Sequence, residues 1–379
     1  MSRVDVCFAL VGSIPHNSRA LRQLRALVDM GLRIEAIGVA PPAPLPADLR
    51  DAVHYRTLPP PTATGPRFFW QVHRQLRAAV VSCIARIYHA SDLYVLPALA
   101  AAARRHGGRL VFDVRERYPY VAGTAGRPVR QHFWKLVERH YIHRADLVLT
   151  VSDGIANHLV QDYNITPPLI LYNAPAIPAS VSPALSLRRR LQLSDRAVLF
   201  LYQGQLRPDR GCLLPLEVLS DVPAAVLVYL GDGPLAPAIR ERAAALEVAD
   251  RVYLLPPVLP DELLAVTASA DIGLVLLEDT CLNHRLALPN KLFEYLAAGV
   301  PVLVSDLPEL RRVVETYGVG YVVDTHNREA LTAAMRRLAE DASLRRRLAA
   351  RTRVAFAAHS WTRLVSRFQE AYRNLLCDM

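Results

Sequence analysis

Two charged residues in the last third of the chain could bind a nucleotide. The stretch LPNKLFEYLAAGVPVLVSD, residues 288–306, contains Lys291 and Glu294, and Lys291 is one of only two lysines among 45 basic residues. Asn290 suits a helix cap, so we expect a helix to begin at Lys291, with Glu294 one turn on along the same side. A cation at the positive end of a helix is unfavourable unless an anion binds there. The alternative interpretation is a surface lysine–glutamate pair.

Other loops of the same half also suit an anion. In YQGQLRPDRG, residues 202–211, Gly204 follows an apolar run and Arg210 precedes Gly211, which would let backbone amides approach a phosphate. GDGP, residues 231–234, and PPVLPDEL, residues 256–263, follow two further apolar runs. Arg210 and Lys291 could hold a pyrophosphate, and the carboxylate of Glu294 could accept hydrogen bonds from ribose hydroxyls. These residues predict a site for a nucleoside diphosphate.

Short apolar runs alternate with amphipathic ones along the whole chain. This pattern predicts an α/β protein with two Rossmann-like, doubly wound parallel-sheet domains facing a cleft. In the first half we expect strands at VDVCFALVG, RIEAIGVA, DLYVLP, RLVFDV, DLVLTVS and LILYN, and in the second half at RAVLFLYQG, AAVLVYLGDG, RVYLLPPV, DIGLVLL, VPVLVSD and GYVVD. The expected domains are residues 1–175 and residues 186–358. A proline-rich linker at residues 176–185 separates them, and a final helix within residues 359–379 is expected to pack back toward the first domain.

The order of these motifs resembles a known enzyme family. The loop with Gly204, Arg210 and Gly211, the GDGP turn and above all PNKLFEYLAAGVPV look like the second domain of retaining GT-B glycosyltransferases of the family 4 type. HNSRALRQLRALVDMG, SDLYVLPALAAAARRHGGRLVFDVRE and HRADLVLTVSDGIANHL resemble the first domain of that family. The resemblance implies a hexosyltransferase whose catalytic residues are Arg115, Arg210 and Lys291. It implies donor-binding residues Gly12, Gly204, Gln205, Arg210, Gly233, Val258, Leu286, Asn290, Lys291 and Glu294, and acceptor-binding residues His16, Arg19, Asp92, Tyr94 and Glu116.

Three positions depart from the family pattern. Gln205 stands where many members have arginine, and Leu286 stands where the family often has a glutamate that contacts the donor sugar. Arg115 replaces a histidine in the run Asp113, Val114, Arg115, Glu116. Arginine cannot act as a base, so Arg115 could stabilise departing phosphate, bind an acceptor anion, or pair with Glu116 or Asp92.

The resemblance also implies a mechanism without a metal. The sequence contains no D-x-D motif, and cationic side chains and helix ends would neutralise the leaving diphosphate. We therefore expect no cofactor and no metal ligand, with a nucleotide-diphosphate sugar as co-substrate. The family's retention of anomeric configuration would carry over, and no obvious nucleophile argues for a covalent intermediate.

Composition limits the partners and the location. The formal charge of +10 permits an anionic partner, but the arginines are spread along the chain and no nucleic-acid module is recognisable. Five cysteines without metal spacing indicate reduced thiols, so we expect a cytoplasmic protein with no membrane span. Two basic segments rich in aromatic residues, 67–90 and 127–144, are expected to form amphipathic helices and suit peripheral contact with an anionic membrane, such as the inner face of the plasma membrane. The alternative is that their aromatic residues are core.

Several functions therefore stay open. The leading interpretation is transfer of a sugar from a nucleotide donor to a saccharide, a lipid-linked saccharide or a small molecule. A sugar-nucleotide epimerase can share the fold, but it would need catalytic carboxylates and histidines in the cleft, and the missing histidine at Arg115 counts against it. A nucleotide-sugar-binding protein without turnover fits the departures at Gln205, Leu286 and Arg115. Nucleic-acid binding rests on charge alone and predicts strongly salt-dependent affinity for any duplex.

Overall fold

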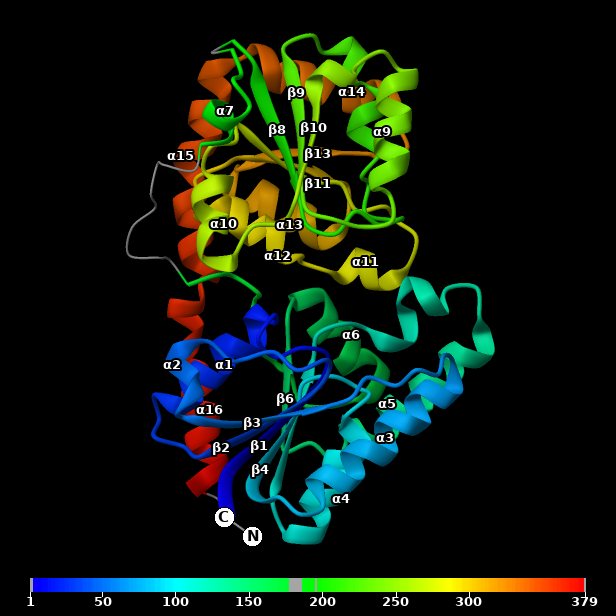
Figure 1. Ribbon diagram of the computed structural model, residues 1–379, viewed down its shortest axis with the longest axis vertical. Helices are drawn as coiled ribbons and strands as arrows, with labels where there is room; N and C mark the ends of the chain where they lie inside the picture. Colours follow the sequence, from blue (N-terminus) through cyan, green and yellow to red (C-terminus); the bar gives the residue numbers. More distant parts are fainter. Residues whose placement is uncertain (1–2, 177–185, 195, 378–379) are drawn as a thin grey trace. The chain divides into compact units, whose positions relative to one another are not determined.

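The computed structural model describes residues 3–176, 186–194 and 196–377. Residue contacts divide the chain into two compact units: unit 1 contains Met1–Tyr172 and Leu364–Met379, and unit 2 contains Asn173–Arg363. The expected linker, residues 176–185, lies outside the described residues except for its first residue. Each unit is built on an all-parallel sheet covered by helices (Figure 1), which confirms the predicted α/β class with two parallel-sheet domains.

The sheet of unit 1 has seven strands in the order β3-β2-β1-β4-β5-β6-β7. Its strands are β1 (Arg3–Val11), β2 (Ile34–Val39), β3 (Val53–Leu58), β4 (Ile84–Ala90), β5 (Arg109–Val114), β6 (Leu147–Thr150) and β7 (Leu169–Ile170). Its helices are α1 (Ser18–Val28), α2 (Ala47–Arg50), α3 (Pro66–Val80), α4 (Leu96–His106), α5 (Pro128–Ile142) and α6 (Asp153–Tyr163), with 3-10 turns η1 (Tyr118–Tyr120) and η2 (Ala122–Thr124). The direction of winding reverses between β1 and β4, and ligands bind at such switch points in open parallel sheets.

One expected strand of unit 1 is wrong. DLYVLP forms a turn that leads into α4, because the Asp92 carboxylate accepts hydrogen bonds from the amides of Tyr94 and Val95 at 2.9 and 3.0 Å. The strand at this place in the sheet is β4, within a segment that we expected to be a basic amphipathic helix. That helix, α3, ends at Val80, and central residues of β4, including Ile87 and Tyr88, are buried between β1 and β5.

The sheet of unit 2 has six strands in the order β10-β9-β8-β11-β12-β13. All six expected strands are present, as β8 (Val198–Gln203), β9 (Ala225–Leu230), β10 (Val252–Leu255), β11 (Ile272–Val275), β12 (Val302–Ser305) and β13 (Gly320–Val323). The helices are α7 (Leu187–Arg190), α8 (Leu214–Glu217), α9 (Ala236–Ala245), α10 (Pro260–Thr267), α11 (Leu282–Leu286), α12 (Asn290–Ala297), α13 (Pro308–Tyr317), α14 (Arg328–Glu340) and α15 (Ala342–His359), with 3-10 turns η4 (Leu219–Asp221) and η5 (Ala249–Arg251). The switch point of this sheet lies between β8 and β11.

The last helix, α16 (Trp361–Cys377), packs on unit 1 through most of its length. The Tyr372 hydroxyl meets Nδ1 of His89 on β4 at 2.5 Å, and the Gln369 side chain donates to the Ala26 carbonyl at 3.0 Å. Burial lowers the pKa of His89 to about 4, so its imidazole is neutral in this contact. Among the helices described, none combines the length and apolar character that crossing a bilayer requires.

Candidate active site

Lys291 lies in the first turn of α12, at the carboxyl edge of the unit 2 sheet. The expected cap residue is wrong by one position: Asn290 is already helical, and the N-cap is Pro289, which has no side chain that could satisfy the helix amides. Tyr295 fixes α12 on the sheet, because its hydroxyl donates to the Leu201 carbonyl at 2.7 Å and accepts from the Gln203 amide at 3.0 Å. Gly273 on β11 permits this close approach, since a Cβ there would lie 2.3 Å from the Tyr295 ring.

The Lys291 ammonium lies over the aromatic ring of Tyr202, at the end of β8. The nitrogen is 3.6 Å from the ring centre, a cation–π contact in a half-buried position. Burial, assisted by the charge of Arg210, lowers the pKa of Lys291 from 10.5 to about 7, although Glu294 and Cys212 act in the opposite direction. A nearby anion would favour the ammonium form, so binding of a phosphate would restore the full positive charge.

Glu294 is held by a chain of side-chain hydrogen bonds. The Gln203 amide donates to the Glu294 carboxylate at 2.5 Å, and the Thr267 hydroxyl donates to the Gln203 carbonyl oxygen at 2.9 Å. Thr267 and Gln203 are both buried, so this hydrogen-bonded chain leads from the protein interior to Glu294. These hydrogen bonds orient the Glu294 carboxylate. A fixed orientation is what the recognition of ligand hydroxyl groups requires.

Glycines bring the loops at this edge into contact. The GDGP turn packs on the loop after β8, since a Cβ on Gly231 would lie 2.0 Å from the Gly204 carbonyl and one on Gly233 would lie 2.3 Å from the Leu206 carbonyl. Gly211 has φ +66° and a Cβ there would lie 1.7 Å from the Leu276 carbonyl. A Cβ on Gly204 would face Nζ of Lys291 at 4.0 Å, so the open side of this loop points toward the ammonium.

Arg210 belongs to the same cluster. It is half-buried directly before Gly211, whose amide donates to the Glu278 carboxylate beyond β11 at 3.3 Å. The Arg210 charge lowers the pKa of Lys291, which places the two cations in one electrostatic environment at the switch point. Neighbouring cations of this kind raise the local positive potential, which attracts anions.

The other predicted donor-binding residues of unit 2 lie at the same edge of the sheet. Gln205 is exposed, and its carbonyl accepts a hydrogen bond from the Tyr202 hydroxyl at 3.0 Å. Val258 is half-buried beyond the end of β10. Leu286 ends α11 and is half-buried, whereas Asn290 is exposed. The structure thus brings Gly204, Arg210, Gly233, Lys291 and Glu294 together around the loops of β8 and β9.

A second polar cluster lies at the switch point of the unit 1 sheet. The Asp92 carboxylate accepts a hydrogen bond from the Val11 amide at 2.7 Å, next to Gly12 with φ +129°, and so joins the ends of β1 and β4. The Arg115 guanidinium lies 3.7 Å from Asp92, the pairing that we considered as an alternative role. The buried Arg115 Nε has no hydrogen-bond partner among the described residues. Burial raises the pKa of Asp92 despite the opposing effect of Arg115.

The other residues predicted to bind the acceptor substrate differ in burial. Arg19 is 4% exposed and makes a bidentate ion pair with Asp113, with both distances 2.7 Å, so its guanidinium stabilises the sheet and is not presented to a substrate. His16 and Glu116 are exposed, and Nδ1 of His16 meets the Ser13 hydroxyl at 2.7 Å. Tyr94 is half-buried, and desolvation raises its pKa to about 12.

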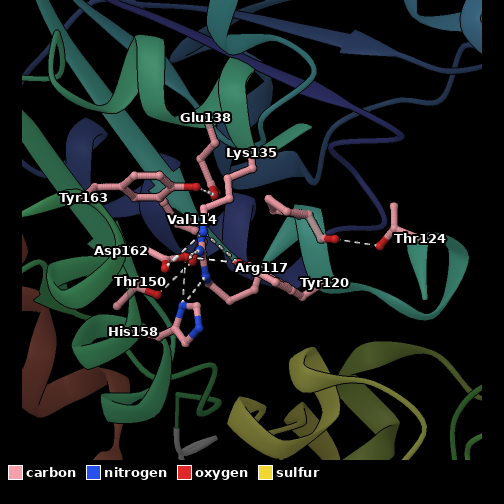
Figure 2. Close-up of polar contacts among 11 residues, drawn as sticks. Val114, Arg117, Tyr120, Thr124, Lys135, Glu138, Thr150, His158, Asp162 and Tyr163 are labelled. Atoms are coloured by element: carbon pink, nitrogen blue, oxygen red, sulfur yellow. Dashed lines mark hydrogen bonds and ion pairs between the residues drawn. The ribbon is translucent and has the colours of Figure 1, made fainter. Parts of the chain in front are cut away.

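Sequence reasoning missed the buried cluster around Arg117 (Figure 2). This guanidinium is fully buried and binds Glu138 on α5, Asp162 on α6 at 2.7 Å and His158 at 3.1 Å. The Tyr163 hydroxyl also donates to Glu138, at 2.7 Å. Arg117 stands directly before η1 and therefore anchors the segment that carries Arg115 and Tyr118 to α5 and α6.

Some of the residues that sequence reasoning missed do have a weak signal in the sequence. Tyr202 and Gln203 immediately precede Gly204, so the sequence places them at the end of a strand. Their contacts with Lys291 and Glu294 could not be predicted, because these contacts depend on how α12 packs. Nothing marked Thr267 or Arg117 as members of a polar cluster. Within the described ranges, no group of three or more His, Cys, Asp and Glu side chains is placed to hold a metal ion.

Family models match both halves of the chain. Residues 185–355 match the model described as glycosyl transferases group 1, and residues 17–174 match the model of glycosyltransferase family 4. Among curated proteins, the chain is 27% identical over 267 residues to a D-inositol 3-phosphate glycosyltransferase of Salinispora tropica, covering 64% of this chain and 53% of that protein. The chain therefore spans about half the length of the curated relatives that it matches.

Solved structures show the same fold over nearly the whole chain. The sucrose-phosphate synthase of Thermosynechococcus elongatus superposes with a TM-score of 0.79 at 18% identity, covering 99% of this chain and 100% of that one. HepE of Anabaena in complex with UDP-glucose superposes with a TM-score of 0.74 at 14% identity, again covering 99% and 100%. At these identities the similarity establishes the fold of both units.

Proposed function

Because the chain belongs to the family 4 type of glycosyltransferases and has the GT-B fold, we propose that it transfers a sugar from a nucleotide-diphosphate sugar to a hydroxyl acceptor. The observation that carries this proposal is the cluster of Lys291, Arg210 and Glu294 at the switch point of unit 2. Lys291 and Arg210 would bind the diphosphate with amides of the glycine loops, and Glu294 would bind the ribose. As the bond from the sugar to phosphate breaks, the same cations would stabilise the leaving diphosphate.

The finer features of the reaction belong to the same proposal. We propose UDP as the carrier, supported by the UDP-glucose complex of the structurally similar HepE. We also propose retention of anomeric configuration and independence from metal, which the resemblance to retaining members of the family supports. The acceptor is a saccharide, a lipid-linked saccharide or a small molecule, and Arg115 with its unpartnered Nε suits an anionic group on it. Five free cysteines, three of them buried, support a cytoplasmic location.

Calorimetric titration of UDP, GDP, ADP and dTDP, with EDTA present, tests the donor site. We expect UDP to bind the parent protein most tightly and to lose about 2 kcal/mol of binding free energy with Lys291→Ala, because a charge-assisted contact to phosphate is removed. Lys135→Ala is the matched control, since it removes the other lysine, which lies in unit 1. Absence of binding by all four nucleotides, or equal binding by Lys291→Ala, would contradict the proposed donor site.

A second candidate is nucleotide-sugar binding without turnover. The ion pair between Arg115 and Asp92 favours it, because it engages the residue that replaces the family's histidine. Incubation with the matching nucleotide sugars and a panel of saccharide acceptors separates the two functions. Release of the nucleoside diphosphate together with a glycosylated product supports transfer, and NMR of the new anomeric linkage tests retention. Tight donor binding without either product supports the binding function.

A further inference from the structure

Helix α5 turns large apolar side chains toward solvent. Val129, Phe133 and Leu136 are 83%, 55% and 52% exposed and follow one another at helical spacing along one side of α5. Trp70 on α3 is 60% exposed. A helix that covers a sheet normally buries its apolar side chains and exposes polar ones. This side of unit 1 therefore has an apolar surface that the sheet does not require.

The same surface is positively charged. Arg67, Arg74 and Arg77 on α3 and Arg130 and Arg139 on α5 are exposed. The one acidic residue of these two helices, Glu138, is buried against Arg117. The Arg74 guanidinium lies 5.0 Å from the ring centre of Trp70, so charge and apolar area adjoin. We call this surface the α3–α5 face, defined by Trp70, Val129, Phe133 and Leu136 with the five arginines.

A chain of aromatic contacts leads inward from the α3–α5 face. The rings of Phe133 and Trp134 are 5.2 Å apart, and Trp134 contacts Phe69 at 4.6 Å and Tyr94 at 5.2 Å. Tyr94 contacts Tyr118 at 5.4 Å, and its amide binds the Asp92 carboxylate. The exposed aromatic surface is thus continuous with the Asp92–Arg115 cluster of unit 1.

We propose that the α3–α5 face binds the surface of a bilayer that contains anionic lipids. Trp70, Phe133 and Leu136 would enter the interfacial layer, while the surrounding arginines contact lipid phosphates. Charge complementarity selects this occupant over a second copy of the chain, because two such faces would oppose arginine to arginine. The inference goes beyond the proposed reaction, since the surface contains none of the donor-binding residues.

Sedimentation of the 379-residue protein with vesicles tests the proposal. We expect binding to vesicles of phosphatidylcholine with phosphatidylglycerol, little binding to phosphatidylcholine alone, and weakening as salt is raised. Phe133→Ser with Leu136→Ser should lower the vesicle affinity by about tenfold or more, because both side chains would lose apolar burial. Val354→Ser is the matched control, because Val354 is 66% exposed on α15 of unit 2; it should bind like the parent.

Substitution of arginines on the α3–α5 face tests the electrostatic part of the proposal. Arg74→Gln with Arg130→Gln should lower the affinity by about fivefold for each arginine, whereas Arg346→Gln with Arg353→Gln on the exposed side of α15 should not. No binding by the parent, or equal binding by all variants, would overturn the proposal. Self-association without vesicles that Phe133→Ser with Leu136→Ser abolishes would identify a second copy as the occupant. Nucleotide titration of the same proteins separates this outcome from a failure of the donor site.

Discussion

The Lys291 ammonium lies 3.6 Å from the centre of the Tyr202 ring, with the open side of Gly204 toward it. The ring contact holds the ammonium in place, while burial and the charge of Arg210 lower its pKa to about 7. Lys291 is therefore charged in only part of the free protein at neutral pH. A bound anion would favour the protonated form of Lys291, so ligand binding is coupled to proton uptake.

Nucleotide affinity should fall as the pH rises through about 7. The ammonium binds phosphate, and a lowered pKa means that the free protein loses this proton as the pH rises past that value. Binding above it must take up a proton, so affinity should drop by up to about tenfold per pH unit. Titrations in buffers of different ionisation enthalpy measure the uptake. Lys291→Arg stays charged and should lose this pH dependence; its persistence there would assign the effect to another group.

Variants of Glu294 and Gln203 should weaken recognition of the nucleoside part of the ligand and leave recognition of the diphosphate unchanged. Glu294→Gln removes the carboxylate, and Gln203→Leu removes the amide that orients it at 2.5 Å. Either change should weaken nucleoside diphosphate binding by about 1–3 kcal/mol and leave pyrophosphate binding nearly unchanged. Calorimetry with both ligands gives the comparison, with exposed Glu315→Gln on α13 as the control. Equal losses for both ligands would show that Glu294 does not recognise the ribose.

Gly211→Ala should unfold more readily than the parent. A Cβ at this position meets the Leu276 carbonyl at 1.7 Å and must also accept φ +66°, so we expect a loss of about 3 kcal/mol in unfolding free energy. Gly299→Ala has a similar φ of +79° but open space around it, and should cost only about 1–2 kcal/mol. Urea unfolding of the two variants measures the difference. Equal stabilities would mean that the loop shifts to accommodate the methyl group.

Arg117→Ala should strongly destabilise unit 1. It leaves the fully buried Glu138 without its ion-pair partner, a change that costs about 3–5 kcal/mol in buried pairs. Arg117→Leu combined with Glu138→Leu removes both charges and should recover much of that loss. Thermal unfolding monitored by circular dichroism compares the three proteins. A double variant less stable than Arg117→Ala would show that hydrogen bonds to Asp162 and His158 outweigh the Glu138 charge.

The sequence by itself determined the architecture where the local pattern of apolar and polar residues fits only one kind of element. Apolar, β-branched runs predicted every strand of unit 2, and because parallel strands end at one edge, Arg210 and Lys291 could be assigned to that edge. The same reasoning failed at β4, because apolar residues with interspersed arginines fit a helix as well as a strand. There the position between β1 and β5 decided the conformation.

Tertiary structure alone decided which charged residues are accessible and which are used internally. Arg19 and Arg115 look alike in sequence, yet Arg19 is buried against Asp113 while Arg115 keeps a nitrogen without a partner among the described residues. The cation–π contact between Lys291 and Tyr202 and the Gln203–Glu294 hydrogen bond each join residues about ninety positions apart. The pKa of Lys291 near 7 arises from burial and from the charge of Arg210. Such properties depend on burial and distance between side chains, which packing sets and local sequence does not.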